Sequence, residues 1–169
     1  MISAFALCLA LSTATIEDPP WMKQQLPNDS AIVAERFQAS ERFAVSLCIS
    51  ARGTQETPDT HGWRHLLEHL LVKGPDKNLD QKLEMDGLFL TADTYRDFMH
   101  ISIVGPKGKL DDALSAFSVF FKPLKTDAAE IKREVEIIRQ EMAVQSDAIR
   151  LCMAAWTACY SDSGLDPVG

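Results

Sequence analysis

Two histidines and a glutamate, His65, Glu68 and His69, lie close together in an apolar stretch of the sequence. In a helix, residues four apart share a face, so His65 and His69 can each offer a ring nitrogen to one metal ion. Glu68 points to the same side of the helix but is offset from the line through the two histidines, so it can hold a metal-coordinated water instead of the metal. Zinc lowers the pKa of such a water to about 7, and a neighbouring carboxylate can take its proton during attack on a peptide carbonyl. The motif therefore indicates a hydrolytic zinc site.

A hydrolytic zinc site needs a third protein ligand and one open coordination position. Candidates follow in residues 134–141, which read Glu-Val-Glu-Ile-Ile-Arg-Gln-Glu. Glu134 and Glu141 are two helical turns apart and share one face of a helix, whereas Glu136 is expected on another, exposed face. The spacing allows one of the shared pair to bind the metal while the other hydrogen-bonds a ligating histidine, and it leaves open which does which.

The plain alternative is a helix with two ordinary histidines and a glutamate in a salt bridge. The other two histidines of the chain are expected to have no metal role. His61 lies four residues before His65, but Gly62 follows it at the expected helix start, which favours a loop position. His100 lies in an expected strand without a metal-type partner nearby, so a plain strand position is expected.

Turn residues and apolar periodicity divide the chain into the elements that must position these side chains. The motif lies in an expected helix over residues 62–73, which Gly74-Pro75 ends. A capping pair, Asp127 and Glu130, opens a long helix that is expected to reach about residue 160. Strands are expected at residues 31–37, 43–51, 88–94 and 98–104, and further helices at residues 79–85 and 110–121. This uneven interleaving predicts an α+β fold instead of a regular array of βαβ units.

Several other segments are given simple structural roles. Residues 17–25, which contain Pro19-Pro20, are expected to form a linker. Cys48 is expected to be buried in its strand, because a free cysteine packs as a small hydrophobe. Cys152 and Cys159 are about 10 Å apart on one helix face, too far for a disulfide unless the helix breaks. An apolar set at helical spacing is expected to be core and not a binding groove: Leu114, Phe117, Phe120 and Phe121.

Size and composition exclude several classes of protein. The chain has 169 residues, of which 46% are hydrophobic and 24% charged, which is typical of one soluble globular domain. A net charge of −7 without a basic stripe argues against a nucleic-acid partner. Residues 2–11 are almost wholly apolar and Ser12-Thr13-Ala14 suit cleavage, so residues 1–18 are expected to be a signal peptide, with a core element as the alternative. Because the apolar run is too short to span a bilayer, no membrane span is expected, and the location is expected to be secreted or periplasmic.

The sequence around the motif resembles the pitrilysin family, the inverzincin peptidases that include insulin-degrading enzyme and the mitochondrial processing peptidases. The likeness runs from about Leu26 to Gly169. Leu26-Pro27-Asn28 and the strands that follow resemble the family's opening hairpin. The family's signature loop and helix resemble residues 52–56 (Arg-Gly-Thr-Gln-Glu) and 61–74 (His-Gly-Trp-Arg-His-Leu-Leu-Glu-His-Leu-Leu-Val-Lys-Gly). Gly87 and then Thr91-Ala92-Asp93-Thr94 stand where the family has glycine and then Asn-Ala-x-Thr.

This resemblance implies a fold and a mechanism. Residues 19–169 would form an α+β domain, with a two-layer antiparallel sheet packed with helices, that is incomplete at its C-terminal end. His65, His69 and Glu141 would bind one zinc ion per chain, Glu68 would be the general base, and Glu134 would hydrogen-bond a ligating histidine. The strand edge that pairs with an extended peptide or unfolded protein would be formed by Thr91, Ala92, Asp93 and Thr94, with little sequence preference.

The sequence departs from the family pattern in three respects. Thr91 replaces the usual asparagine, which affects hydrogen bonding to substrate but not metal binding. The interval from His69 to Glu141 is a little shorter than in the family, which indicates a trimmed loop. Family members continue into a second, similar half that closes over the substrate, so a homo- or hetero-oligomer with such a half is expected. We therefore expect a zinc-dependent endopeptidase that needs a partner chain; the alternative is a non-catalytic zinc-binding or partner subunit.

Overall fold

The structure, a computed structural model, describes residues 21–27, 29–36, 39–57 and 59–160. The expected signal peptide at residues 1–18 lies outside these residues. The chain divides into two compact units, residues 1–39 and residues 40–169, and each is described by itself. In the described part of the chain, no helix combines the length and the apolar character needed to cross a membrane.

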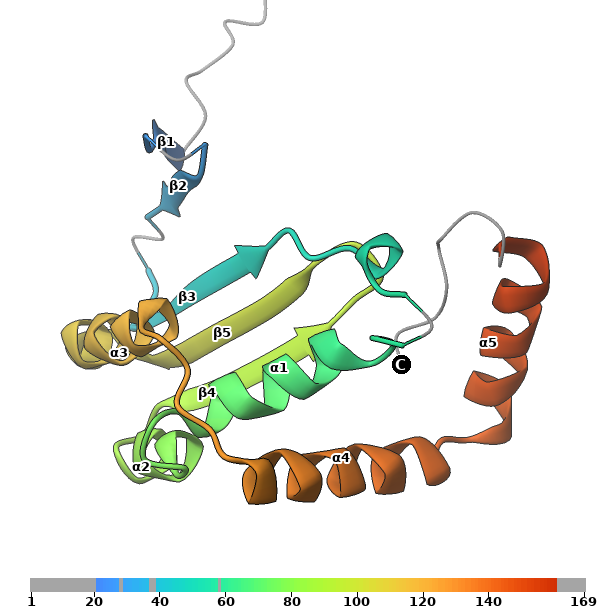
Figure 1. The fold of residues 1–169 in the computed structure, drawn as a ribbon. Helices are drawn as coiled ribbons and strands as arrows, with labels where there is room; N and C mark the ends of the chain where they lie inside the picture. The colour runs from blue at the N-terminus through green and yellow to red at the C-terminus, as the bar shows by residue number, and fades with distance from the viewer. Residues whose placement is uncertain (1–20, 28, 37–38, 58, 161–169) are drawn as a thin grey trace, which may run out of the picture. The chain divides into compact units, whose positions relative to one another are not determined.

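The first unit contains a β-hairpin of β1 (Trp21–Gln25) and β2 (Ala31–Glu35), which pair antiparallel (Figure 1). Every residue of both strands is exposed. The strand expected from residue 31 is confirmed by β2, but the linker expected over residues 17–25 is wrong for Trp21–Gln25. Because neither face of the hairpin is buried, β1 carries none of the alternation by which a strand is recognised in a sequence.

The second unit is built on a three-stranded antiparallel sheet in the order β3-β5-β4 (Figure 1). Its strands are β3 (Arg42–Ile49), β4 (Phe89–Thr94) and β5 (Met99–Pro106). Its helices are α1 (Trp63–Lys73), α2 (Leu79–Met85), α3 (Leu110–Phe117), α4 (Ala128–Ala143) and α5 (Asp147–Tyr160), with 3-10 turns at Gly53–Gln55, Lys107–Lys109 and Ser118–Phe121. The predicted α+β class with an antiparallel sheet is confirmed.

One face of the sheet is covered by helices and carries the core. The register sets Val45 of β3 and Leu90 of β4 on either side of Ile103, and Ile101 follows along β5 on the same face. Ile101 and Ile103 are fully buried. Helices α2 and α3 close the core with Leu79, Leu83, Ala113, Ala116 and Phe117. Since each large apolar side chain contributes roughly 1.5–3 kcal/mol when fully buried, β5 is the most firmly held strand.

The opposite face of the sheet is mostly exposed, and it includes Cys48. The expectation that Cys48 is buried is wrong: β3 alternates, so Leu47 faces the core and Cys48 faces outward beside His100. His100 lies in β5, as expected for a plain strand residue. Cys152 and Cys159, both on α5, are free thiols.

The apolar set expected in the core divides between core and solvent. The helix expected over residues 110–121 becomes α3 followed by a 3-10 turn. Phe117 and Phe120 pack in the core, but Leu114 is 49% exposed and Phe121 is 73% exposed, so the expectation is wrong for these two residues. The change of helix type rotates Phe121 away from the face that Phe117 occupies, because a 3-10 helix has three residues per turn.

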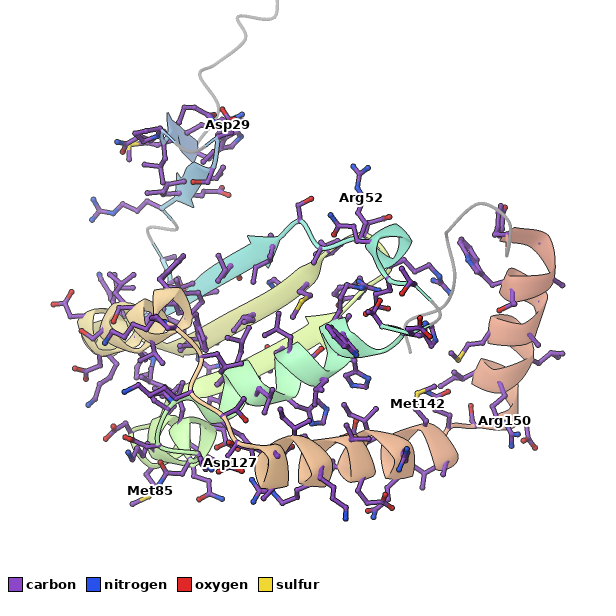
Figure 2. All side chains as sticks on the ribbon, in the orientation of Figure 1. Asp29, Arg52, Met85, Asp127, Met142 and Arg150 are labelled. Atoms are coloured by element: carbon purple, nitrogen blue, oxygen red, sulfur yellow. The ribbon has the colours of Figure 1, made fainter. Side chains whose placement is uncertain are left out.

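The long helix expected to reach residue 160 is two helices, α4 and α5. Asp127 caps α4 as predicted, since its carboxylate accepts a hydrogen bond from the backbone N–H of Glu130 at 2.8 Å (Figure 2). The helix ends at Ala143, and α5 begins after Ser146, whose hydroxyl accepts from the backbone N–H of Ile149 at 3.3 Å. The prediction of a continuous helix is therefore wrong, because Ser146 caps a new helix.

Candidate metal centre

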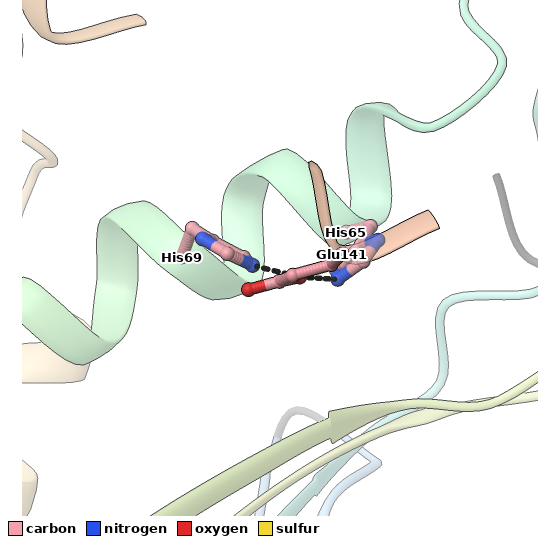
Figure 3. A group of neighbouring side chains, drawn as sticks. All are labelled: His65, His69 and Glu141. Carbon is pink, nitrogen blue, oxygen red and sulfur yellow. Dashed lines mark ion pairs between the residues drawn. The ribbon is translucent and has the colours of Figure 1, made fainter. Parts of the chain in front are cut away.

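Helix α1 packs between the edge strand β4 and helix α4 (Figure 1). At this junction His65 and His69 of α1 meet Glu141 of α4 (Figure 3). Gly62 precedes the helix with a φ of 87°, and Gly74 ends it. One helical turn brings both imidazoles to the same side, with their ring centroids 5.0 Å apart.

The three side chains fit the coordination sphere of one zinc ion. The Nε2 atoms of His65 and His69 lie 3.6 and 3.4 Å from the same Glu141 oxygen, Oε2, and one atom from each residue lies within 4.8 Å of the others. Ligands at about 2.0–2.2 Å from a tetrahedral zinc are about 3.3–3.6 Å apart, whereas N–H···O hydrogen bonds span about 2.7–3.2 Å. The spacing suits three atoms around a shared ion better than hydrogen bonds between them.

Glu134, the other candidate carboxylate, contacts different partners. Its side chain is fully buried, its Oε2 lies 3.4 Å from Nδ1 of His69, and Lys73 and Arg133 donate hydrogen bonds to its Oε1. Burial by itself raises the pKa of Glu134, but the hydrogen bonds from Lys73, Arg133 and His69 outweigh burial and hold that pKa below its usual value. When Nδ1 of His69 donates to Glu134, its Nε2 is the unprotonated nitrogen that faces Glu141.

The remaining polar residues near the motif lie apart from this group. Glu136 is exposed and pairs with Arg139 at 3.6 Å, as its position on another helix face predicts. His61 is half exposed in the turn before α1, where its Nδ1 lies 3.9 Å from Glu56. The structure thus brings His65, His69 and Glu141 together, with Glu134 behind His69.

Glu68 lies on α1 and faces the edge strand, where its Oε2 accepts a hydrogen bond from the hydroxyl of Thr94. A cleft of about 270 Å³ opens beside it. Helix α1, strand β4 and the end of α4 surround this cleft; Figure 2 labels Met142 at the end of α4. The lining residues are His65, Glu68, Ala92, Asp93, Thr94, Tyr95, Met142 and Gln145. A carboxylate at this position can accept a proton from a water molecule in the cleft.

Residues Thr91 to Thr94 lie in β4, at one edge of the three-stranded sheet. Within the described residues, β4 pairs with β5 and with no other strand. Ala92 and Thr94 are half-buried toward the covered face, and Thr91 and Asp93 are exposed on the other face. An unpaired edge offers backbone N–H and C=O groups to an added extended strand, so β4 can bind a peptide beside Glu68.

The sequence did not reveal the contacts that hold these groups in place. The hydroxyl of Thr94 binds Glu68, Lys73 binds Glu134, and Glu56 lies beside Arg64 at the start of α1. Lys73 is four residues after His69, a spacing that signals a shared helix face. Thr94 and Glu68 are 26 residues apart, and Glu56 and Arg64 are joined across a loop, so neither helical spacing nor residue type predicts these two contacts.

Comparisons with known proteins identify a family that this chain resembles in sequence. A sequence model of the insulinase family (peptidase family M16) matches residues 31–162. A probable mitochondrial-processing peptidase subunit beta of Arabidopsis thaliana is 26% identical over 138 residues, which cover 79% of this chain and 26% of that protein. A nardilysin-like protein of the same plant is 35% identical over 121 residues, 66% of this chain and 12% of that protein. The chain therefore spans about a quarter or less of the length of these two relatives.

Solved structures show the same fold. The first half of the periplasmic protease PqqL from Escherichia coli superposes with a TM-score of 0.72 at 20% sequence identity. The matched region covers 83% of this chain and 33% of that chain. At this level of identity the match concerns the fold, an arrangement of helices on an antiparallel sheet.

Proposed function

This chain belongs to the insulinase family of peptidases (peptidase family M16), and from that premise we propose that it is the metal-binding part of a zinc-dependent endopeptidase. The proposed ligands of one zinc ion per chain are His65, His69 and Glu141. The observation that carries the proposal is that two imidazoles and a carboxylate converge within 4.8 Å beside a cleft that Glu68 lines. The resemblance to the pitrilysin family is confirmed at the level of the family.

The mechanism assigns a separate task to each residue. When bound at this site, zinc supplies Lewis acidity that lowers the pKa of coordinated water to about 7. Glu68, as the general base, accepts the proton that the water loses when it attacks the peptide carbonyl. Thr94 donates to Oε2 of Glu68 and so fixes the direction in which the other carboxylate oxygen points. Glu134 orients His69 through its Nδ1.

The proposed substrate is an extended peptide or an unfolded protein. The free edge of β4, with Thr91, Ala92, Asp93 and Thr94, supports this proposal, because an added strand would pass beside Glu68 and the cleft. Such pairing uses backbone groups, so we expect little sequence preference. We also propose a signal peptide at residues 1–18 and a peptidase domain over residues 19–169. Relatives named for the mitochondrion and for the periplasm do not decide the location, so export is proposed on the leader sequence alone.

The test replaces Glu68 with glutamine, which keeps the shape of the side chain but cannot accept the proton. Zinc content and casein cleavage are measured on the same sample of the active assembly, which includes a second pitrilysin-like half if the chain alone cleaves poorly. Glu84→Gln, an exposed substitution on α2, is the control. We expect Glu68→Gln to keep its zinc and to cleave roughly 10²–10⁴-fold more slowly than the wild type. Full cleavage by this variant would rule out Glu68 as the general base, and loss of zinc would make it a structural residue.

A further inference from the structure

Arg64 is a buried cation that the metal chemistry does not use. It precedes His65 in α1 and is 8% exposed. Its Nη1 donates hydrogen bonds to the backbone carbonyls of Ala51 at 2.8 Å and Tyr95 at 2.6 Å. Ala51 follows β3, and Tyr95 follows β4 directly. One guanidinium nitrogen therefore attaches the start of α1 to two segments at the same end of the sheet.

Glu56 holds the start of α1 from the other side. The N-cap residue of α1 is Gly62, which has no side chain with which to cap the helix. The Glu56 carboxylate accepts instead from the backbone N–H groups of Gly62 at 3.3 Å and of Arg64 at 2.8 Å, and it lies 3.5 Å from Nε of Arg64. A carboxylate at a helix N-terminus also interacts favourably with the helix dipole. Glu56 therefore fixes both the start of α1 and the orientation of Arg64.

Arg64 and Glu68 contact consecutive residues at the end of the edge strand. Arg64 donates to the carbonyl of Tyr95, and Glu68 accepts from the hydroxyl of Thr94. Because residues four apart share a helix face, these contacts attach α1 to the end of β4 at two points, one turn apart. The attachment fixes the distance between the proposed general base and the strand proposed to bind substrate.

Stability alone does not account for a buried arginine here. Nη2 of Arg64 is buried without a hydrogen-bond partner, and Nε has only the Glu56 carboxylate at 3.5 Å. A buried donor without a partner is destabilising, and an apolar side chain of similar volume often replaces a buried ion pair without loss of stability. The benefit of Arg64 therefore lies in the two carbonyls that it fixes.

We propose that Arg64, oriented by Glu56, is a positioning residue that holds the end of the edge strand β4 beside Glu68, so that an extended peptide can bind along this strand. The inference rests on the proposed function, because it concerns how the substrate meets that site. Without Arg64, the end of β4 can move away from α1. The proposed metal ligands lie on α1 and α4, which pack directly against each other, so they keep their places.

The test compares Arg64→Met, which fills similar space without donors, with Arg64→Lys, which keeps a cation. Arg139→Met, at an exposed arginine on α4, is the control. KM and kcat for casein cleavage are measured in the assembly that cleaves casein, with a second pitrilysin-like half present if the chain alone cleaves poorly. Zinc affinity, by competition with a chelator, and Tm are measured for each chain. We expect Arg64→Met to raise KM roughly tenfold or more, the effect of losing hydrogen bonds from a charged donor. We expect zinc affinity to stay at the wild-type value, Arg64→Lys to recover part of the loss, and Arg139→Met to match the wild type.

Two results would overturn the inference. A purely structural role would lower Tm and leave KM of the folded protein unchanged, and a parallel loss of zinc affinity would place the effect at the metal instead. If Arg64→Met does not fold, Arg64→Lys decides by the same criterion.

A wild-type chain that binds no zinc contradicts the proposed function, but not the attachment of α1 to β4 through Arg64. Binding of fluorescein-labelled casein then tests the attachment by itself: weaker binding by the Arg64 variant supports it, and equal binding overturns it.

Discussion

Glu134 and Glu141 share one face of α4, yet their surroundings make them chemically different. Glu134 is fully buried and receives hydrogen bonds from Lys73 and Arg133 on one oxygen, with His69 beside the other. Glu141 is half exposed and directs one oxygen at both Nε2 atoms. Because Lys73 and Arg133 already balance the charge of Glu134, we propose Glu141 as the carboxylate that binds the metal.

We predict that Glu141→Ala retains zinc much more weakly than the wild type. Removing even a hydrogen-bonding partner of a ligand costs metal sites roughly 10–100-fold in affinity, so loss of a ligand is expected to cost at least as much. Elemental analysis after dialysis against a chelator measures the effect. Glu136→Ala, on the exposed face of α4, is the matched control and is expected to retain zinc. Full retention by Glu141→Ala, with loss in Glu134→Ala or Glu136→Ala, would assign the ligand to another residue.

Helical spacing in the sequence predicts some of the site's arrangement but not all of it. The spacing of His65, Glu68 and His69 predicted a shared helix face, and the structure has it. The same kind of spacing left Glu134 and Glu141 equivalent, because both lie on the face toward α1. The packing of Lys73 against Glu134 separates them, and that contact joins helices far apart in the chain.

At the scale of elements, the end of α1 is set by the backbone of Gly74. Its φ of 63° and ψ of −176° belong to a region that is essentially restricted to glycine. A Cβ added at this position would lie 2.9 Å from Cβ of Leu79. The helix therefore ends where Lys73 can still reach Glu134, and α2 begins close by.

We predict that Gly74→Ala lowers the free energy of unfolding by about 1–3 kcal/mol, the cost of a strained backbone conformation. Chemical denaturation of the full chain measures this value. Gly108→Ala is the control, because a Cβ at Gly108 meets no atom within 4 Å. Equal stability of the two variants would show that the end of α1 tolerates a side chain and is not fixed by Gly74.

Elements with one buried side were predictable from the sequence, and elements without one were not. The bounds expected for α1, α2 and the sheet strands are close to those observed, because buried residues recur in them at regular intervals. Strand β1 buries neither face, so its sequence predicts a linker instead of a strand. The break between α4 and α5 contains neither glycine nor proline. Its local signal, the N-cap Ser146, lies between two other polar residues, Gln145 and Asp147, in a sequence that otherwise reads as helix.

At the scale of the whole molecule, the second unit exposes several large apolar side chains. Phe121 is 73% exposed, Trp63 63% and Phe89 59%. The resemblance to the insulinase family supports the proposal that a second half contributes to the working enzyme.

We predict that this chain alone binds zinc but cleaves peptides poorly, and that a second pitrilysin-like half restores activity. The residues proposed to activate water all lie between His65 and Glu141, so metal binding does not depend on the partner. Holding a peptide in line with that water can supply as much as ~7–11 kcal/mol of the barrier, and an open site forfeits much of it. Cleavage of casein with and without a candidate partner is the measurement. Efficient cleavage by a proven monomer would contradict the prediction.

The central claim is that His65, His69 and Glu141 hold one zinc ion at the junction of α1 and α4. Crystals of the zinc-loaded chain, with diffraction data collected on both sides of the zinc absorption edge, locate the ion directly. We predict one strong anomalous peak at about 2.0–2.2 Å from Nε2 of both histidines and from a carboxylate oxygen of Glu141. A peak ligated by other residues, or no peak at this junction in zinc-loaded crystals, would contradict the account.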